Sequence, residues 1–416
     1  MSSAFDVVCD PLLRRDARDF SRHGPLDPTL LTTMLLYMVA DAGRRGYEIL
    51  LDALWDEARS HGLQLPTEHP ISAASFCEAR AKITPRLLRR MVHEIATSAF
   101  QDKHMSRRWH GRRVFAIDGT KVNLQRSPGL HKAFGTPHEA HCPQLLLSVL
   151  LDVCAKHPVD FEIAPFASDE RRHLLAMLPS LAEGDLLILD RGYPSHEILQ
   201  ALVQSKIDFL IRVPSSNTFH VIDELQASDQ SERECEMLPP PGSPSDWVPL
   251  RLRAVRVPGP DQCDAYFITS LDASECTVSS IGEVYRMRWE VEEFFKLMKG
   301  PYIGQRQFRS KSPTGVRQEV SALVLFLAIT RLCTETVVVS AEQPQTETSQ
   351  KAAVLAVASH LTRILMPTHA DHALQEIARL LDRISTRCYK RRPGRSCPRI
   401  SFKPTPRWGS QGRRGA

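Results

Sequence analysis

The sequence lacks the features that would place it outside the ordinary globular proteins. Its longest uninterrupted apolar run covers eight residues, 322–329, whereas a helix that crosses a membrane needs about 20. Residues 1–6 do not combine a basic start with an apolar stretch, which argues against a secretory signal peptide. Hydrophobic residues make up 42% of the chain and charged residues 24%, which excludes a mostly disordered chain, a collagen and a coiled-coil rod. We therefore expect a cytoplasmic protein with no membrane part.

The cysteines lack the spacing that disulfide frameworks and zinc sites require. Ten cysteines are scattered along 416 residues without a single CxxC pair, a pattern that favours reduced thiols. One alternative stays open. Cys142 together with His138 and His141 is a candidate zinc site, although a second pair of ligands at zinc-finger spacing is missing.

Acidic residues are missing from the C-terminal end. Residues 383–416 contain eleven Lys and Arg and no Asp or Glu, whereas the first 382 residues hold the other 42 of the 53 basic residues and all 48 acidic ones. A basic tail on a mildly acidic body indicates a polyanionic partner. A solvated terminus without a partner is the alternative.

The pattern of apolar residues divides the chain into regions with different predicted secondary structure. Apolar residues at spacings of three and four predict helices near the N-terminus, and Pro85 marks the start of one of them. The apolar runs 145–153 and 159–164 are separated by a short turn and predict an antiparallel hairpin. We expect a mixed α/β fold with a mixed β-sheet. Its predicted regions are a helical domain over 1–105, the first part of an α/β core over 106–214, a β-rich insertion over 215–282, the second part of the core over 283–340, and C-terminal helices with the basic tail over 350–416.

Two acidic residues follow short apolar strands. Asp118 comes after the run 114–117 and Asp190 after the run 186–189, and a glycine-containing turn follows each of them. Strand ends in α/β sheets open onto the cleft where ligands bind, so we expect both carboxylates at this edge. A turn-forming role is the alternative for each residue taken alone.

A helical segment over 285–299 adds a third carboxylate. On one continuous helix, Tyr285, Arg288, Glu292 and Lys299 share a polar strip about 60° wide beside an apolar face. Three carboxylates suit two Mg²⁺ ions about 3.5–4 Å apart, which catalyse phosphoryl transfer. The neighbouring cations favour a polyphosphate substrate over the sugar of a glycosidase. An amphipathic helix with solvated charges is the alternative.

These motifs, in this order, resemble those of the DDE transposases of the bacterial insertion-sequence-four family. The most specific one is Tyr285-(2)-Arg288-(3)-Glu292-(6)-Lys299, which follows Asp118-Gly119-Thr120 and Asp190-Arg191-Gly192-Tyr193. The resemblance covers about residues 25–335. It implies an RNase H-like catalytic core with a mostly β insertion between the second Asp and the Glu.

The resemblance also implies an activity and its partners. Such a protein would bind double-stranded DNA at the inverted-repeat ends of an insertion sequence through its N-terminal helices. It would then act as a homodimer that cuts the element out and joins it to target DNA, in the bacterial nucleoid. The alternatives are a catalytically silent DNA-binding protein derived from a transposase, and a structure-specific nuclease on the same core.

Nine residues receive roles by this resemblance. Asp118, Asp190 and Glu292 would be catalytic and would bind two Mg²⁺ ions, for which Mn²⁺ can substitute. Trp247 is a candidate for holding a flipped base, but its loop-like surroundings keep it out of the predicted site. The predicted DNA-binding and supporting residues are Tyr285, Arg288, Lys299, Arg191, Tyr193 and Arg212.

Overall fold

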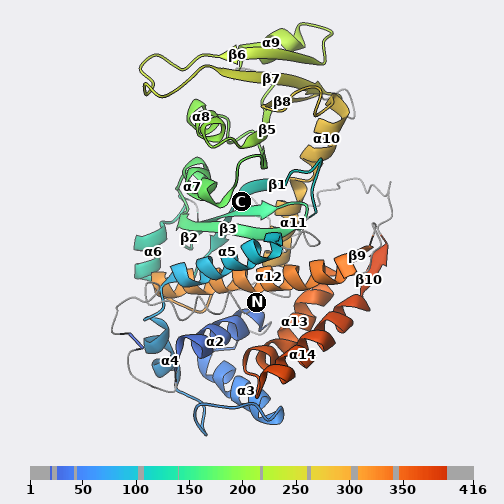
Figure 1. The fold of residues 1–416 in the computed structure, drawn as a ribbon. Helices are drawn as coiled ribbons and strands as arrows, with labels where there is room; N and C mark the ends of the chain where they lie inside the picture. The colour runs from blue at the N-terminus through green and yellow to red at the C-terminus, as the bar shows by residue number, and fades with distance from the viewer. Residues whose placement is uncertain are drawn as a thin grey trace, which may run out of the picture.

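An eight-stranded mixed β-sheet forms the centre of the protein (Figure 1). The structure is a computed structural model. It describes residues 19–20, 26–41, 45–101, 107–138, 140–215, 219–259, 264–300, 308–340 and 346–390. The strands of the sheet are β1 (Val114–Asn123), β2 (Gln144–Asp152), β3 (His157–Pro165), β4 (Leu186–Leu189), β5 (Asp208–Val213), β6 (Glu232–Met237), β7 (Leu250–Val257) and β8 (Ala265–Thr269).

The strand order is β3-β2-β1-β4-β5-β8-β7-β6. β2 pairs antiparallel with both β1 and β3, which confirms the predicted hairpin. β4 lies parallel to β1 and β5, so the sheet is mixed as predicted. β8 pairs antiparallel with β5, and β7 pairs antiparallel with β8 and β6. The β-strands of the segment 215–282 therefore extend the same sheet.

Side chains of the central strands alternate between two apolar cores. In β1, Val114 and Ala116 belong to one core, and Phe115 and Ile117 belong to the other. This two-residue period is the direct consequence of extended backbone, in which successive side chains point to opposite faces. Both faces are buried, which explains why β4 is apolar throughout.

Helices cover both faces of the sheet (Figure 1). One face packs against α7 (Glu170–Met177), the 3₁₀ turn Leu178–Ser180, α8 (His196–Gln204) and α9 (His220–Gln226). The other face packs against α5 (Pro85–Gln101), α10 (Val278–Arg286), α11 (Trp289–Lys299) and α12 (Pro313–Ser340). α5 begins at Pro85, as the sequence predicts, because proline needs no hydrogen-bond acceptor in the first turn of a helix.

A second group of helices packs against α12 on the side away from the sheet (Figure 1). A buried ion pair joins the group to α12, since the Arg80 guanidinium lies 3.2 Å from the Glu319 carboxylate. Tyr47 donates a hydrogen bond of 2.6 Å to the same carboxylate. The group comprises α2 (Pro28–Ala40), α3 (Tyr47–Ser60), α4 (Ala73–Arg80), α13 (Gln350–Leu365) and α14 (Ala370–Ser385). A further helix, α6 (Pro128–Phe134), lies beside β3.

α12 is the one helix among the described residues that is long and apolar enough to cross a membrane. Its most apolar 18-residue window has a mean hydropathy of 2.0, so the eight-residue run does not by itself exclude such a span. However, 78% of that window is buried inside the protein. The packing of α12 between the sheet and the second group of helices accounts for its apolar composition.

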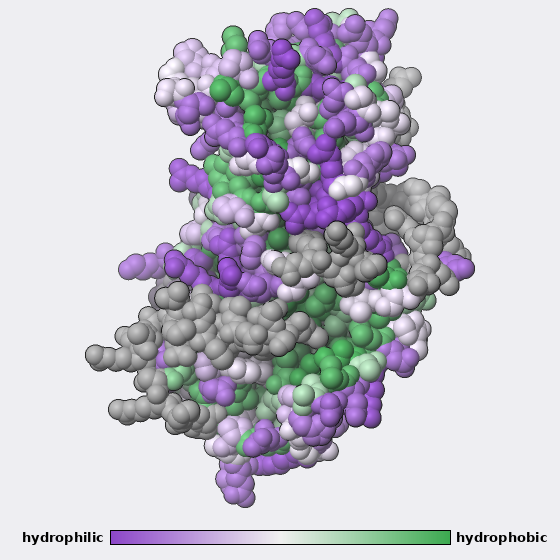
Figure 2. All heavy atoms as spheres, viewed as in Figure 1, coloured by the Kyte–Doolittle hydropathy of each residue, from purple (hydrophilic) through white to green (hydrophobic). Residues whose placement is uncertain are grey.

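The C-terminal part of the described chain ends in a small two-stranded sheet. β9 (Thr346–Thr348) pairs antiparallel with β10 (Cys388–Lys390), directly after α14. Most of the predicted basic tail, residues 391–416, lies outside the described residues. The face drawn in Figure 2 is mostly hydrophilic, with apolar side chains gathered over the α13 and α14 region, where Leu355 and Leu374 are exposed.

Candidate active site

The first two predicted carboxylates lie side by side on neighbouring strands. β4 ends at Leu189, so Asp190 follows it directly, as predicted. Asp118 lies inside β1, which corrects the prediction that it follows the end of a strand. β1 continues because its second half pairs with β2, from Asp118 opposite Val149 onwards. Its parallel pairing with β4 places Ala116 opposite Ile188. Asp118 and Asp190 each lie two residues after this pair, so they come at the same level of the sheet.

The third carboxylate comes from a bent helical segment. The structure divides the predicted continuous helix into α10, which ends at Arg286, and α11, which begins at Trp289. The amide of Arg288 bonds to the Tyr285 carbonyl three residues back, and tight bonds of this kind typically mark a junction or helix end. Glu292 lies in the first turn of α11.

Arg288 joins two of the three predicted carboxylates. Its guanidinium donates a hydrogen bond of 3.2 Å to Asp118 and one of 2.6 Å to Glu292. The Arg288 side chain is 15% exposed, and the two carboxylates are 23% and 29% exposed. The ion pairs are therefore partly buried, and solvent and salt screen them less than pairs on the open surface. A residue of β1 and a residue of α11, 174 positions apart by their numbers, thus share one cation.

Burial and neighbouring charges shift the pKa of Asp118, some raising it and others lowering it. Burial raises the pKa of Asp118, and the charge of Asp190 raises it further. Arg288 and the backbone N–H of Gly119 lower the same pKa because they stabilise the carboxylate. Asp190 accepts a hydrogen bond of 2.8 Å from the Gly192 amide. The effect of Asp190 on Asp118 agrees with the strand register, which places the two residues side by side.

A fourth carboxylate, Glu170, also faces this site and was missed by the sequence reasoning. Burial raises the pKa of Glu170, and the charges of Asp118 and Asp190 raise it further. The residue opens α7, far in sequence from the other acids, and its only local signal is its place after the helix N-cap Asp169. A Cβ atom at Gly119 would lie 2.4 Å from the Glu170 carboxyl group, so glycine at this position leaves room for it.

Tyr193 holds Glu170 and is itself enclosed. It is 2% exposed, and its hydroxyl donates a hydrogen bond of 3.2 Å to Glu170. Burial raises the pKa of Tyr193 well above its ordinary value, and the charges of Glu170 and Asp118 add to the effect. In this conformation, Tyr193 is placed to support the site through Glu170 and has almost no surface for a partner.

The other predicted residues surround the acids at different depths. Lys299 donates a hydrogen bond to the Thr120 hydroxyl on β1, and burial lowers its pKa. Tyr285 is half-buried and packs edge to face on Phe267 with ring centroids 4.8 Å apart. Burial raises the pKa of Tyr285, whereas the nearby charges of Arg288 and Arg212 lower it.

Three further predicted or candidate residues lie at the periphery. Arg191 and Arg212 are exposed, after β4 and in β5 respectively. Trp247 lies in the connection between β6 and β7, next to Val248, whose carbonyl accepts a hydrogen bond from Gln200 of α8. This position places it with the far strands of the sheet.

The residue types of the site fit a divalent metal ion, and one cation already stands among them. Carboxylate oxygens are the hard donors that Mg²⁺ prefers. Yet within the described part of the chain, no three His, Cys, Asp or Glu side chains form a group arranged to hold a metal. Arg288 supplies the positive charge between Asp118 and Glu292 instead. The alternative zinc site of His138, His141 and Cys142 is not formed either.

Comparison with known proteins places the chain in a family. Residues 109–330, more than half of the chain, match the family model described as the transposase DDE domain. The chain belongs to this family. The matched range contains β1, β4 and α11, and therefore all three predicted carboxylates.

Two further similarities concern single proteins. "Putative transposase InsZ" of Escherichia coli (strain K12) is 20% identical over 139 residues, which are 32% of this chain and 46% of that protein. The chain thus spans about half the length of this curated relative. Among solved structures, the piggyBac transposase synaptic complex with hairpin DNA is similar with a TM-score of 0.46 and 14% identity, over 95% of this chain and 82% of that one.

Proposed function

We propose that this protein is a DNA transposase of the insertion-sequence-four group, which cuts an element at its inverted-repeat ends and joins it to target DNA. The observation that carries the proposal is the single guanidinium of Arg288, which pairs with both Asp118 and Glu292. Asp190 lies beside them. Membership of the DDE transposase family supplies the class of reaction, phosphoryl transfer on DNA.

We infer an RNase H-like core for this site. The sheet segment β3-β2-β1-β4-β5, with its antiparallel first part and its parallel β1, β4 and β5, supports this assignment. Such a core provides two acids on or directly after neighbouring parallel strands, here β1 and β4. It provides a third acid on a helix that packs against the first strand, here α11 against β1. The helices α2 to α5 are proposed to bind the ends of the element.

Asp118, Asp190 and Glu292 are proposed to hold two Mg²⁺ ions, which Mn²⁺ can replace. When bound, such ions activate an attacking oxygen and stabilise the leaving oxygen of an in-line displacement. The carboxylates supply negative oxygen donors from three different elements, so the site keeps its shape only in the folded chain.

The chain's own cations have a separate task. Arg288 is proposed to exchange its carboxylate partners for a DNA phosphate, since a guanidinium binds either oxyanion in the same forked geometry. Lys299, held at Thr120, and the exposed Arg191 and Arg212 add positive charge at the same edge. Tyr193 keeps Glu170 in place beside the acids.

Partners and alternatives follow from the same proposal. We propose double-stranded DNA as substrate and target, and a homodimer that holds two ends together. A silent DNA-binding protein would bind end DNA without cutting it, and a structure-specific nuclease would cut without joining. Neither alternative is favoured by a particular contact in the structure.

The experiment that tests the proposal uses Glu292→Ala with a labelled duplex taken from the repeats that flank the gene. Cleavage in Mg²⁺ or Mn²⁺ should fall at least about a thousandfold, while binding to the duplex changes little. Glu283→Ala, an exposed glutamate of α10, is the matched control and should keep the wild-type rate. Cleavage at the wild-type rate by Glu292→Ala would refute the assignment. Joined products in the wild-type reaction separate a transposase from a nuclease.

A further inference from the structure

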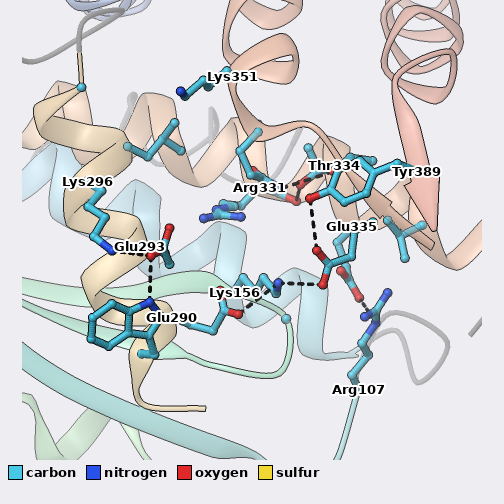
Figure 3. A pocket seen from close by; sticks show the side chains of 18 residues that line it. Arg107, Lys156, Glu290, Glu293, Lys296, Arg331, Thr334, Glu335, Lys351 and Tyr389 are labelled. Atoms are coloured by element: carbon cyan, nitrogen blue, oxygen red, sulfur yellow. Dashed lines mark hydrogen bonds and ion pairs between the residues drawn. The ribbon is translucent and has the colours of Figure 1, made fainter. Parts of the chain in front are cut away.

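A second charged site lies beside α11, formed by residues other than Glu292 (Figure 3). It is a pocket of about 540 Å³. Its walls come from α11, α12, the start of α13, and the strands β9 and β10. None of the nine residues predicted for the DNA site lines it, so whatever it binds is a question separate from the proposed function.

Every glutamate that lines this pocket already has a cationic partner. Four glutamates are involved, and three basic residues neutralise them. The pairs are Glu293 with Lys296 at 2.6 Å, Glu290 with Lys156 at 3.1 Å, Glu347 with Lys156 at 3.3 Å, and Glu335 with Arg107 at 2.9 Å.

Arg331 is the exception in the pocket. It is 3% exposed, and its Nε atom is buried without a hydrogen-bond partner. No hydrogen bond or ion pair of its guanidinium occurs with any described residue. Figure 3 shows this guanidinium directed into the pocket, toward the side of Glu293. The charges of the four glutamates of the pocket act on this guanidinium, but none of them accepts a hydrogen bond from it. A buried N–H donor without an acceptor is costly, so a ligand oxygen that accepts from Arg331 would offset this cost.

A second cation of the pocket also lacks an acceptor among the residues described. Lys351, near the start of α13, is exposed and lines the pocket. Figure 3 shows it above Arg331 in the view and apart from the Arg331 guanidinium. Among the described residues that line the pocket, five side chains are basic and four are acidic, so these residues carry one positive charge in excess.

We propose that this pocket binds a phosphate group, with Arg331 as its buried donor and the exposed Lys351 as a second cation of its lining. A phosphate offers several acceptor oxygens and up to two negative charges, which match a forked guanidinium and a second cation. An apolar ligand would leave the buried Nε–H of Arg331 without an acceptor. The same chemistry has two sources, a free phosphate monoester or the terminal phosphate of a DNA strand.

The test measures thermal stabilisation of the full chain by inorganic phosphate. Phosphate should raise the melting temperature of the wild type in a saturable way. Arg331→Met should lose the rise, with affinity at least about tenfold weaker, because charge-assisted hydrogen bonds are removed. The control Arg251→Met replaces an exposed arginine of β7 and should keep the wild-type response. Arg331→Lys, which keeps the charge but not the fork, should respond weakly and covers the case in which the methionine variant does not fold.

A second arm identifies the source of the phosphate. A single-stranded oligonucleotide with a 5′-phosphate is compared with the same strand without it. If DNA supplies the group, the phosphorylated strand binds the wild type about tenfold tighter and Arg331→Lys loses the difference. If a free monoester supplies it, both strands bind alike while inorganic phosphate still requires Arg331. The proposal is overturned if phosphate gives no stabilisation, or if both Arg331 variants respond as the wild type does.

Discussion

At the scale of single residues, Arg288 is the group that organises the candidate site. It neutralises Asp118 and Glu292 in the protein without DNA, where the two carboxylates would otherwise repel each other. The same side chain is the one that the proposed reaction requires at a DNA phosphate. If the proposed function is right, the site becomes active only when a DNA phosphate draws Arg288 away and divalent ions bind the carboxylates.

Removing this arginine should therefore make the site more attractive to a divalent ion. In Arg288→Ala, we expect Mn²⁺ to bind the DNA-free protein at least about tenfold more tightly, since one positive charge near two carboxylates is lost. Cleavage of end DNA should decrease at the same time. Titration calorimetry measures the first effect, with Arg286→Ala, exposed on α10, as control. An unchanged Mn²⁺ affinity would show that Arg288 does not occupy the place of an ion.

Local sequence was sufficient to find some of these residues and insufficient for others. The spacing of Arg288 and Glu292 by four positions predicts their contact within a helix, and the structure shows it. Glu170 carries no comparable signal, because its nearness to Asp118 arises from the packing of α7 against the sheet. The missing hydrogen-bond partner of Arg331 was not predictable from the sequence either. It depends on which residues the other charged side chains of the pocket bind.

At the scale of elements, the sheet fixes the position of two acids through strand register. The predicted hairpin was correct because both of its strands are apolar and lie close in sequence. The length of β1 was not predictable in this way. It continues through Asp118-Gly119-Thr120 because β2 supplies backbone partners there, which the sequence of β1 alone does not reveal. The break between α10 and α11 likewise lies within a segment that is helical by pattern throughout.

The end of the hairpin β2–β3 gives a prediction for pH dependence. Asp152 and His157 face each other in the register, and both are buried. Burial raises the pKa of Asp152 to about 7 and lowers the pKa of His157 to about 4. Between pH 4 and pH 6.5 the folded state holds an extra proton on Asp152, whereas the unfolded state holds an extra proton on His157. The two contributions to the free energy of unfolding therefore have opposite slopes and largely cancel.

Asp152→Asn should remove the contribution of Asp152 and leave that of His157. The free energy of unfolding of the variant should then fall by about 3 kcal/mol more than that of the wild type as the pH is lowered from 6.5 to 4. The asparagine oxygen still accepts the amide bonds that Cys154 and Ala155 donate to Asp152, so local structure is kept. Urea unfolding at a series of pH values measures the slope. Parallel curves for both proteins would contradict the assignment of these protons.

At the scale of the whole molecule, α12 connects the sheet to the second group of helices. Its buried ion pair with Arg80 ties α4 to the same helix that packs under β3. The predicted boundary between an N-terminal domain and the core stays a prediction, although one apolar core runs through both parts. Sequence patterns predicted the helices of both parts but not this shared core, because long-range packing leaves no periodic signal.

The structure also refines where the basic tail begins. The described chain continues as α14 and then β10, which pairs with β9, so truncation after Lys390 spares both elements. Residues 391–416 carry eight basic residues and no acid. Their deletion should weaken binding to duplex DNA and reduce its dependence on salt, by about 0.9 in the logarithmic slope for each phosphate that the tail neutralises in the full chain. Fluorescence anisotropy at several salt concentrations measures this, and an unchanged slope would show that the tail does not touch DNA.

Whether three distant carboxylates act on the same ions is best decided by counting the Mn²⁺ ions bound in the complex with end DNA. Electron paramagnetic resonance of the wild-type complex should report two ions for each site. The isosteric variants Asp118→Asn, Asp190→Asn and Glu292→Gln should each retain at most one. If any one of these three variants still binds both ions with the affinity of the wild type, the carboxylate that it lacks is no ligand and the proposed centre is wrong.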